Sequence, residues 1–266
     1  MSEKASIHRS TMPYTVTRLQ AEFAAVGIEK GDSIIFHASL SQAGWVCGGA
    51  IAVIDALQSL LTEEGTLVMP AQTAGLSDPK DWENPPVPEE WWDTIQAETP
   101  VYDKDRTPSA NMGVIAETFR ALKDVKRSEH PYYSFTAWGK HADWILEGQT
   151  LEHGFGKNSP LGKLYEIEAS KIILFGVDND KNTSLHLAEE LSSKIPLKTA
   201  NAAVIENGKR VRKYYQEKAY DSDQFIKVGE AYEKTHGDHK QTIALAPSKV
   251  YKMKEIVDFA ASYFDR

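Results

Sequence analysis

The sequence predicts one layered α/β domain with an antiparallel extension. Up to residue 195, short apolar runs typical of buried strands alternate with segments whose apolar residues recur at helical spacing. After residue 195, two segments flank Asn207-Gly208, the strongest short-range signal for a β-hairpin. No repeat, low-complexity tract or linker divides the chain, so we expect a single domain over residues 1–266.

The expected elements follow in order along the chain. Strands are expected where apolar residues run together, at 33–36, 66–70 and 171–175. Helices are expected at 14–27, 49–61, 111–122, 160–167 and 184–191, and over the last 18 residues from Lys249. Gly27 ends the first helix as a C′ glycine, and one face of the second carries Ile51, Ile54, Leu57 and Leu61. The hairpin strands are expected at 199–205 and 210–215, and residues 71–106, with five prolines, form a long excursion.

Composition is typical of a soluble globular protein from a reducing compartment. Hydrophobic residues make up 41% of the sequence and charged residues 26%. No apolar run approaches the roughly 20 residues that span a bilayer, and the N-terminus lacks the apolar core of a secretion signal. The single cysteine, Cys47, excludes an internal disulfide and is typical of the cytoplasm, where we expect the protein. The net charge of −8 argues against nucleic-acid binding and is compatible with a cationic substrate.

The stretch FHASLSQAGWVCGGAIAVIDALQSLL joins a strand to a helix through a polar turn rich in glycine. Glycines at such a junction let backbone N–H groups approach an anion, and the helix N-terminus adds a favourable dipole. His37, Ser39, Ser41 and the pair Gly48-Gly49 are therefore candidates to hold a phosphorylated cofactor. The alternative is a plain strand–turn–helix joint. The nucleotide-binding loops GxxxxGK[ST] and GxGxxG are both absent.

A second polar segment, DRTPSANMGVIAETF, has a similar character. Thr107 and Ser109 precede the helix expected at 111–122, and Gly113 lies in its first turn. Glycine inside a helix costs about 1 kcal/mol relative to alanine, which indicates close approach of another group. Ser109 is equally compatible with an N-cap that binds no ligand.

The candidate general base is His186, in the motif NTSLHLAEE. It lies in the first turns of a helix just beyond the C-terminal end of a strand, where ligands of open α/β sheets gather. The positive end of the helix disfavours an imidazolium, so we expect a neutral ring, as a base requires. Glu189, Glu190, Asp178 or Asp180 would fix its tautomer. The alternative is a surface histidine flanked by ordinary acids.

The remaining histidines and the cysteine are weaker candidates. His130 precedes a proline and is expected in an extended turn against the neighbouring tyrosines, and His153 adjoins a glycine-rich loop. His236 and His239 lie in a polar loop, and because neither HExxH nor a cysteine cluster is present, we expect no metal. Cys47 has no histidine or lysine close in sequence and is expected to pack in its turn as a small residue.

Residues 77–106 are unusually acidic and aromatic. They contain nine acidic and three basic residues, together with Trp82, Trp91 and Trp92. Carboxylates beside aromatic faces suit a polyamine or an amino sugar through ion pairs and cation–π contacts. The alternative is a solvated surface loop that the tryptophans anchor to the body of the protein.

Taken together, these motifs resemble the aminoglycoside N3-acetyltransferase family, the antibiotic N-acetyltransferases that use acetyl-CoA. The resemblance runs in order from about residue 15 to residue 190 and rests on HASLSQAGWVCGG, GTLVMP, TPSANMG, RSEHPYYSFTAWG, SPLGKLYE and, above all, NTSLHLAEE. The tail after residue 195 is less distinctive. The excursion DPKDWENPPVPEEWW is more similar to family branches of uncertain substrate than to the clinical resistance enzymes.

The resemblance implies a three-layer α/β/α sandwich around a mixed sheet, unrelated to the GNAT acetyltransferases, whose [RQ]xxGx[GA] loop is absent here. It implies that the turn at 37–49 binds the pyrophosphate and pantetheine of coenzyme A, with a neighbouring segment alongside. The implied cofactor-binding residues are His37, Ser39, Leu40, Ser41, Trp45, Val46, Gly48, Gly49, Thr107, Ser109 and Met112. It also implies that His186 is the general base, and we assign its supporting acid to Glu189.

The implied activity is transfer of an acetyl group from acetyl-CoA to the 3-amino group of an aminoglycoside. An amine attacks a thioester only when neutral, so His186 would remove its proton while the turn amides or the Thr107 and Ser109 hydroxyls stabilise the oxyanion. We expect direct transfer without a covalent intermediate on Cys47. The alternatives are an acyl-CoA transferase or hydrolase with another acceptor, and a non-catalytic antibiotic-binding protein. The sequence is compatible with a monomer or a homodimer.

Overall fold

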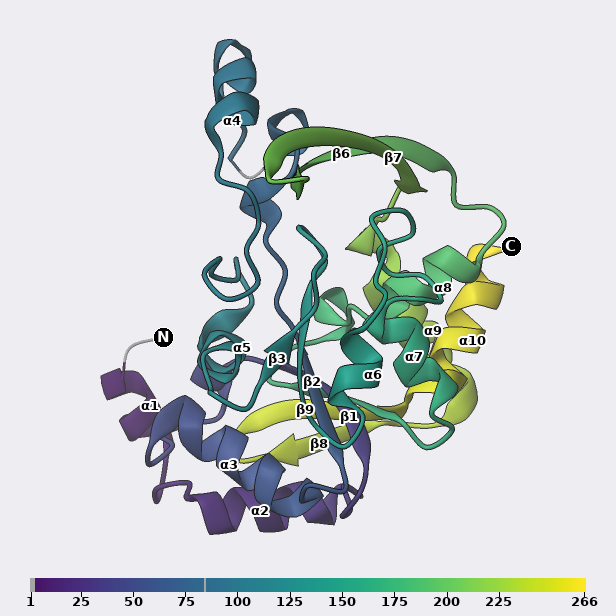
Figure 1. The fold of residues 1–266 in the computed structure, drawn as a ribbon. Helices are drawn as coiled ribbons and strands as arrows, with labels where there is room; N and C mark the ends of the chain where they lie inside the picture. Colours follow the sequence, from purple (N-terminus) through teal and green to yellow (C-terminus); the bar gives the residue numbers. More distant parts are fainter. Residues whose placement is uncertain (1–2, 84) are drawn as a thin grey trace.

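The computed structural model describes residues 3–83 and 85–266, which form a mixed seven-stranded sheet between helices and a separate two-stranded hairpin (Figure 1). The strands are β1 (Ser33–Ala38), β2 (Thr66–Pro70), β3 (Lys126–Arg127), β4 (Phe135–Gly139), β5 (Lys171–Phe175), β6 (Leu197–Glu206), β7 (Lys209–Lys218), β8 (Lys240–Ile243) and β9 (Ala246–Lys252). The α-helices are α1 (Glu3–Arg9), α2 (Val16–Ala25), α3 (Gly49–Leu61), α4 (Trp92–Glu98), α5 (Gly113–Arg120), α6 (Ala142–Leu146), α7 (Pro160–Glu166), α8 (Leu185–Leu191), α9 (Phe225–His236) and α10 (Met253–Phe264). Among the described residues, no helix is long and apolar enough to cross a membrane.

The centre of the sheet is parallel. β1 pairs in parallel with β2 and with β5, and the remaining pairs in the order β3-β4-β2-β1-β5-β9-β8 are antiparallel. The run Ile34, Ile35 and Phe36 in β1 is at most 1% exposed, because a central parallel strand is covered on both faces. The carboxyl ends of β1, β2 and β5 therefore meet at one edge of the sheet, and polar side chains that follow them are brought together.

Alternate residues of the central strands face two different apolar cores. Ile34 and Phe36 pack with side chains of α2, α3 and α5, whereas Ile35 packs with side chains of α6 to α10. This division follows from the two-residue period of a strand. It confirms the expected three-layer α/β/α sandwich around a mixed sheet, with an antiparallel hairpin added to it.

Two expectations about the helices are wrong. The chain from Lys249 does not begin a helix: residues 246–252 form β9, which pairs with β5, and α10 starts only at Met253. The two faces of β9 meet the two cores: Ala246 packs in the core that contains Ile34, and Tyr251 packs in the core that contains Ile35. Ile51 is 41% exposed, whereas Ile54, Leu57 and Leu61 of the same helix are fully buried. Ala50, Ala52 and Val53 of the same turn are at most 8% exposed, so the buried face of α3 is centred on positions other than Ile51.

The hairpin and the excursion form a cap above the sandwich. β6 and β7 turn through Asn207 and Gly208, both with positive φ (51° and 74°), as a two-residue hairpin turn requires. The excursion contains short 3₁₀ turns and α4, and in Figure 1 α4 projects beside the arched hairpin. The two parts are joined by Asn201 Nδ2, which donates to Asp78 Oδ2 at 2.6 Å. The excursion is therefore held in place by the hairpin.

Candidate active site

A cavity of about 370 Å³ lies at the carboxyl edge of the central strands. Its lining comes from the ends of β1 and β2, the start of α5, the loop after β5, α8 and the start of α9. A volume of this size is within the range of small-molecule sites, roughly 300–1,000 Å³. Four of the predicted site residues line it, namely His37, Ser39, Met112 and His186.

His186 is held by a carboxylate that is itself fixed. Its Nδ1 lies 2.6 Å from Oε2 of Glu189, one turn further along α8. The other oxygen of Glu189 accepts the backbone N–H of Asp221 at 2.8 Å, and this glutamate is only 1% exposed. Because the carboxylate accepts the proton on Nδ1, the neutral ring carries its lone pair on Nε2, as a general base requires.

Aromatic rings fix the plane of the His186 imidazole. Phe155 stacks on it with 4.6 Å between ring centroids and 11° between the planes, and Phe225 and Tyr220 meet it edge-on at 4.8 Å and 5.4 Å. Phe155 comes from the loop before α7, Tyr220 and Phe225 come from the stretch between β7 and the start of α9, and none of the three was predicted from the sequence. The glycine-rich loop around His153 was the only signal for Phe155, and no local pattern marks Tyr220 or Phe225.

The other acids considered as partners of His186 have different roles. Glu190 binds Nδ1 of His153 at 2.8 Å and accepts the hydroxyl of Tyr220. Asp178 caps the following 3₁₀ turn and pairs with Lys249 at 2.6 Å. Asp180 lines the cavity and pairs with the neighbouring Lys181 at 3.1 Å. Of the four acids, Glu189 therefore makes the contact that orients His186.

His37 lies in the same cavity and has no such partner. It is 6% exposed, and its Nε2 has no hydrogen bond to any described residue. Burial, followed by the electrostatic influence of His186, lowers the pKa of His37 to about 3. Burial penalises the charged form of a group, so His37 is uncharged at neutral pH and does not supply the positive charge that a phosphate site would use.

Several backbone N–H groups of the turn after β1 already donate hydrogen bonds within the protein. The N–H groups of Ser39 and Cys47 donate to Phe175 and Tyr14, at 2.8 Å each, and that of Trp45 donates to Ser10 Oγ at 2.8 Å. The N–H of Gly49 donates to Val46 at 3.0 Å. Gly48 adopts a positive φ of 87° as the N-cap of α3. Part of the glycine content of this turn therefore serves the strand–turn–helix joint itself.

The residues of this turn divide between several locations. Ser39 lines the cavity, and its hydroxyl lies 3.2 Å from that of Ser41 in the short 3₁₀ turn that begins at Leu40. Trp45 lines a separate hollow against the N-terminal segment, and Val46 is 7% exposed in the core. Leu40, Ser41, Trp45, Val46, Gly48 and Gly49 are not among the cavity-lining residues.

Cys47 differs from the expectation. It was expected to pack in the turn as a small buried residue, but it is exposed. It is also not among the residues that line the cavity with His186. Its thiol is therefore not placed to attack a substrate bound there.

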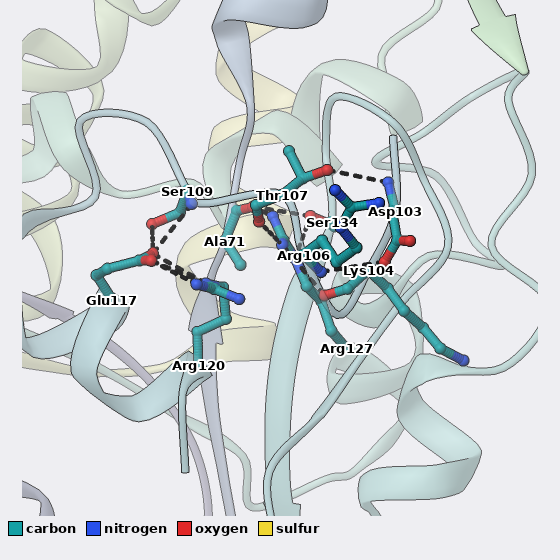
Figure 2. Close-up of polar contacts among 10 residues, drawn as sticks. All are labelled: Ala71, Asp103, Lys104, Arg106, Thr107, Ser109, Glu117, Arg120, Arg127 and Ser134. Atoms are coloured by element: carbon teal, nitrogen blue, oxygen red, sulfur yellow. Dashed lines mark hydrogen bonds and ion pairs between the residues drawn. The ribbon is translucent and has the colours of Figure 1, made fainter. Parts of the chain in front are cut away.

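The segment before α5 makes its own hydrogen bonds (Figure 2). The Ser109 hydroxyl donates to Oε2 of Glu117 at 2.6 Å, and Glu117 also pairs with Arg120 at 2.6 Å. Thr107 Oγ1 accepts the N–H of Asp103 at 2.9 Å. Neither hydroxyl lines the cavity, whereas Met112, three residues beyond Ser109, does. Ser109 thus makes a hydrogen bond to the helix that follows it. This local structural role is close to the ligand-free N-cap that the sequence left open.

Arg127 anchors this segment to the sheet. It is 8% exposed, and its guanidinium donates to the carbonyls of Ala71, at 2.6 Å, and of Thr107 (Figure 2). Its Nε donates to Ser134 Oγ at 3.1 Å. Arg127 makes no ion pair within the described ranges, so its charge is satisfied by oxygen dipoles. Arg127 therefore fixes the segment that leads to Met112 against the residue that follows β2.

The remaining candidates lie away from the cavity. His130 is 2% exposed, and its Nδ1 accepts the N–H groups of Tyr132 and Tyr133 at 3.1 Å and 3.0 Å, which agrees with its expected packing against the tyrosines. Trp82 donates to Ser77 within the excursion, and Trp91 is 55% exposed. None of the excursion's tryptophans is among the lining residues of the cavity. No group of three or more potential metal ligands occurs in the part of the chain that the structure describes.

Comparison with known proteins shows which proteins this chain is similar to. Residues 35–265 match the family model described as aminoglycoside 3-N-acetyltransferase. The chain belongs to the aminoglycoside 3-N-acetyltransferase family. It is 45% identical over 262 residues to the SPbeta prophage-derived aminoglycoside N(3')-acetyltransferase-like protein YokD of Bacillus subtilis (strain 168), covering 98% of this chain and 96% of that protein.

Further members of the family show the same relationship. Aminoglycoside N(3)-acetyltransferase VII of Streptomyces paromomycinus is 30% identical over 281 residues, covering 100% of this chain and 96% of that protein. The crystal structure of YokD superposes with a TM-score of 0.94 over 98% of this chain and 97% of that one. A structure of the AAC-IIIb binary complex with CoASH superposes with a TM-score of 0.83 at 26% identity, covering 95% and 96% of the two chains. The chain is thus an acyltransferase of this family and not a GNAT enzyme.

Proposed function

We propose that the protein transfers an acetyl group from acetyl-CoA directly to an amino group of an aminoglycoside, at the 3-N position, with His186 as general base. The observation that carries this proposal is the His186–Glu189 pair, which faces a cavity at the carboxyl edge of the sheet. The family membership supports the acetyl transfer, and the relative crystallised with CoASH supports the donor. The acceptor rests on the names of the relatives, of which YokD is named only as aminoglycoside N(3')-acetyltransferase-like.

The chemistry follows from the environment of His186. Most aliphatic amines are protonated at neutral pH and are then not nucleophilic. The free Nε2 of His186 takes the proton from the amine, and Glu189 stabilises the resulting imidazolium through Nδ1. The lone pair on the amine nitrogen then forms a bond to the acetyl carbonyl carbon. The carbon–sulfur bond breaks, the nitrogen gives up its remaining extra proton, and the leaving thiolate takes up that proton, so the products are the amide and CoASH.

The residues proposed to hold the donor lie partly in this cavity and partly outside it. Ser39 and Met112 line it, while Gly48 and Gly49 lie at the N-terminus of α3, which has 13 residues and exposes backbone N–H groups of its first turn. A helix N-terminus favours an anionic group such as a pyrophosphate. The remaining donor-binding assignments, Leu40, Ser41, Trp45, Val46, Thr107 and Ser109, stay predictions from the resemblance.

The acceptor is proposed to enter from the side of the acidic excursion. Residues 77–106 carry an excess of six negative charges (nine acidic minus three basic), and the whole chain has a net charge of −8. This charge attracts a polycationic amine to the protein and raises its local concentration. The excursion is anchored by hydrogen bonds between Asp78 and both Gln96 and Asn201, at 3.0 Å and 2.6 Å. We propose no nucleic-acid or membrane partner.

The direct test is release of thiol from acetyl-CoA in the presence of a panel of aminoglycosides, with mass spectrometry of the products. We expect a monoacetylated product from at least one compound and none when His186→Ala replaces the natural protein. Cys47→Ala should retain activity, because Cys47 lies outside the cavity. Activity that persists in His186→Ala, or an acetyl group found covalently on Cys47, would contradict the proposal.

A further inference from the structure

Two imidazoles line one cavity but have different surroundings. His186 has a carboxylate on Nδ1 and three aromatic rings around it, whereas His37 has no hydrogen bond to any described residue. They are close enough that the charge of one disfavours protonation of the other. The proposed reaction needs one base, and His186 supplies it. The chemistry available to His37 therefore has to be of another kind.

His37 is suited to neither of the roles that a histidine commonly plays at a phosphate-bearing ligand. Its burial favours the neutral ring, so it does not attract a phosphate by charge. For the same reason it is too weak a base to accept a proton from an ammonium group. A neutral imidazole has one N–H donor and one lone pair. What remains for His37 is a hydrogen bond made without a change of protonation.

The burial of the two ring nitrogens indicates which one carries the proton. Nε2 of His37 is fully covered and has no partner, whereas Nδ1 is not fully covered and has no hydrogen bond to a described residue. An N–H on the covered Nε2 would lack an acceptor, whereas an N–H on the less covered Nδ1 can reach a ligand or solvent. The proton is therefore placed on Nδ1, and the N–H is left available to a ligand in the cavity that His37 lines.

Several of the donors that the sequence offered for an oxyanion are engaged within the protein or lie outside the cavity. The hydroxyl of Ser109 donates to Glu117 at 2.6 Å, and the backbone N–H of Ser39 donates to Phe175 at 2.8 Å. Thr107 does not line the cavity. These groups include those that the sequence offered as stabilisers of an oxyanion. His37, by contrast, lines the cavity and has a ring N–H that donates to no described residue.

We propose that His37 is a catalytic residue whose Nδ1–H donates a hydrogen bond to the thioester carbonyl oxygen of the acyl donor. This inference rests on the proposed function. As the amine lone pair bonds to the carbonyl carbon, the π electrons move to the oxygen, and His37 stabilises the developing negative charge. When the carbonyl reforms, the carbon–sulfur bond breaks and its electron pair leaves with the sulfur. The first proton of the ammonium goes to Nε2 of His186, the second goes to the leaving sulfur, and His37 keeps its own proton throughout.

A preorganised donor of this kind acts mainly in the transition state, so its loss should lower kcat more than it raises KM. Removing one oxyanion donor typically costs about 100-fold to 1,000-fold in kcat. We therefore expect His37→Leu to lower kcat by about 100-fold, with the KM for acetyl-CoA changed by less than about threefold. His37→Gln places an amide donor in the same region and should recover about tenfold of that loss. Circular dichroism and thermal melting identify any variant that fails to fold.

The outcomes separate the two proposals. If His186→Ala is inactive and His37→Leu keeps its full kcat, the role of His37 is wrong and the proposed function stands. A large rise in KM for acetyl-CoA with unchanged kcat would also overturn it, because His37 would then serve donor binding alone. If the natural protein acetylates no amine, or His186→Ala remains active, the proposed function itself is wrong.

A second measurement uses the unaltered protein and does not depend on folding of a variant. Long-range ¹H–¹⁵N correlation spectra of histidine-labelled protein at pH 7 distinguish the two neutral tautomers and the cation. We expect the His37 signals, assigned by their loss in His37→Gln, to show the neutral ring with the proton on Nδ1. A proton on Nε2, or a charged ring, would overturn the inference.

Discussion

Two neighbouring glutamates of α8 each bind a histidine, and the two pairs differ in what the histidine faces. His186 binds Glu189 at 2.6 Å, and His153 binds the adjacent Glu190 at 2.8 Å. Side chains of both glutamates are at most 6% exposed, but the His186 side chain is 16% exposed and that of His153 is 52% exposed. The same polar pair is therefore present twice, once at a cavity and once at the surface. A histidine–carboxylate contact alone does not mark a catalytic base, and the stacked Phe155 and the cavity make the difference.

Replacing the two histidines in parallel should have the largest effect. His186→Asn removes the proposed base, so we expect kcat to fall by about 100-fold or more. His153→Asn removes the equivalent pair outside the cavity, and asparagine tolerates the positive φ of 55° at this position. Its kcat should stay within about threefold of the natural value in the acetyl-CoA thiol-release assay. An equal fall in kcat in both variants would mean that the two histidine–glutamate pairs do not differ in function.

The two glutamates offer a finer test of the same comparison. Glu189→Gln keeps the shape of the side chain but removes the negative charge that stabilises the His186 imidazolium, so we expect kcat to fall by roughly 30-fold. Glu190→Gln should change kcat by less than about threefold, because its partners His153 and Tyr220 are not among the residues that line the cavity. Steady-state kinetics with both substrates varied would measure this. A larger loss of kcat in Glu190→Gln than in Glu189→Gln would show that Glu189 is not the glutamate that supports catalysis.

A buried histidine without a carboxylate partner extends the comparison to stability. Burial lowers the pKa of His130 from 6.5 to about 4, although the Leu151 carbonyl opposes this change. The unfolded chain therefore takes up the proton first as the pH falls. The free energy of unfolding should decrease by about 1.4 kcal/mol per pH unit between pH 6.5 and pH 4 from this residue, or about 2 kcal/mol in total at pH 5.

His130→Asn should reduce that slope, because the asparagine oxygen can accept the same two backbone N–H groups without titrating. Urea unfolding at several pH values measures the slope independently of any constant loss of packing. His37, whose pKa is lowered to about 3, should leave part of the acid dependence in the variant. An unchanged slope would mean that His130 does not resist protonation in the folded protein.

Tyr220 touches both pairs, and its hydroxyl gives the smallest expected effect. Its ring contacts His186 at 5.4 Å, while its hydroxyl donates to Glu190. Tyr220→Phe keeps the ring and removes the hydroxyl, so kcat should change by less than about threefold. The free energy of unfolding should fall by about 1–3 kcal/mol because the buried Glu190 loses a donor. Thermal melting and kcat measured on the same preparation would separate these effects.

The parts of the fold that were predicted correctly have strong local signals. The strands at 66–70 and 171–175 are continuous apolar runs between polar turns, and the helix at 49–61 begins after a glycine and keeps helical spacing throughout. The stretch from Lys249 was misread because its strand structure depends on hydrogen bonds to β5. Such pairing with a segment more than 70 residues away cannot be seen in local spacing.

The candidate site shows the same division. His186 and Glu189 were found because they lie one turn apart on one helix, a relationship that sequence spacing describes. Phe155 and Tyr220 were missed because tertiary packing alone brings them to the imidazole. The assignment of His37 to a turn that holds a phosphorylated cofactor stays a prediction, and the sequence could not show the burial of this side chain, which is 6% exposed. Burial decides the charge of a histidine, and it is a property of the whole fold.

The most direct test of the account is a crystal structure of the protein with coenzyme A bound. We expect the sulfur of the donor in the cavity between His37 and His186, within about 5 Å of both rings, and the pyrophosphate near the N-terminus of α3. A thiol located elsewhere, for example in the hollow beside Trp45, would contradict it.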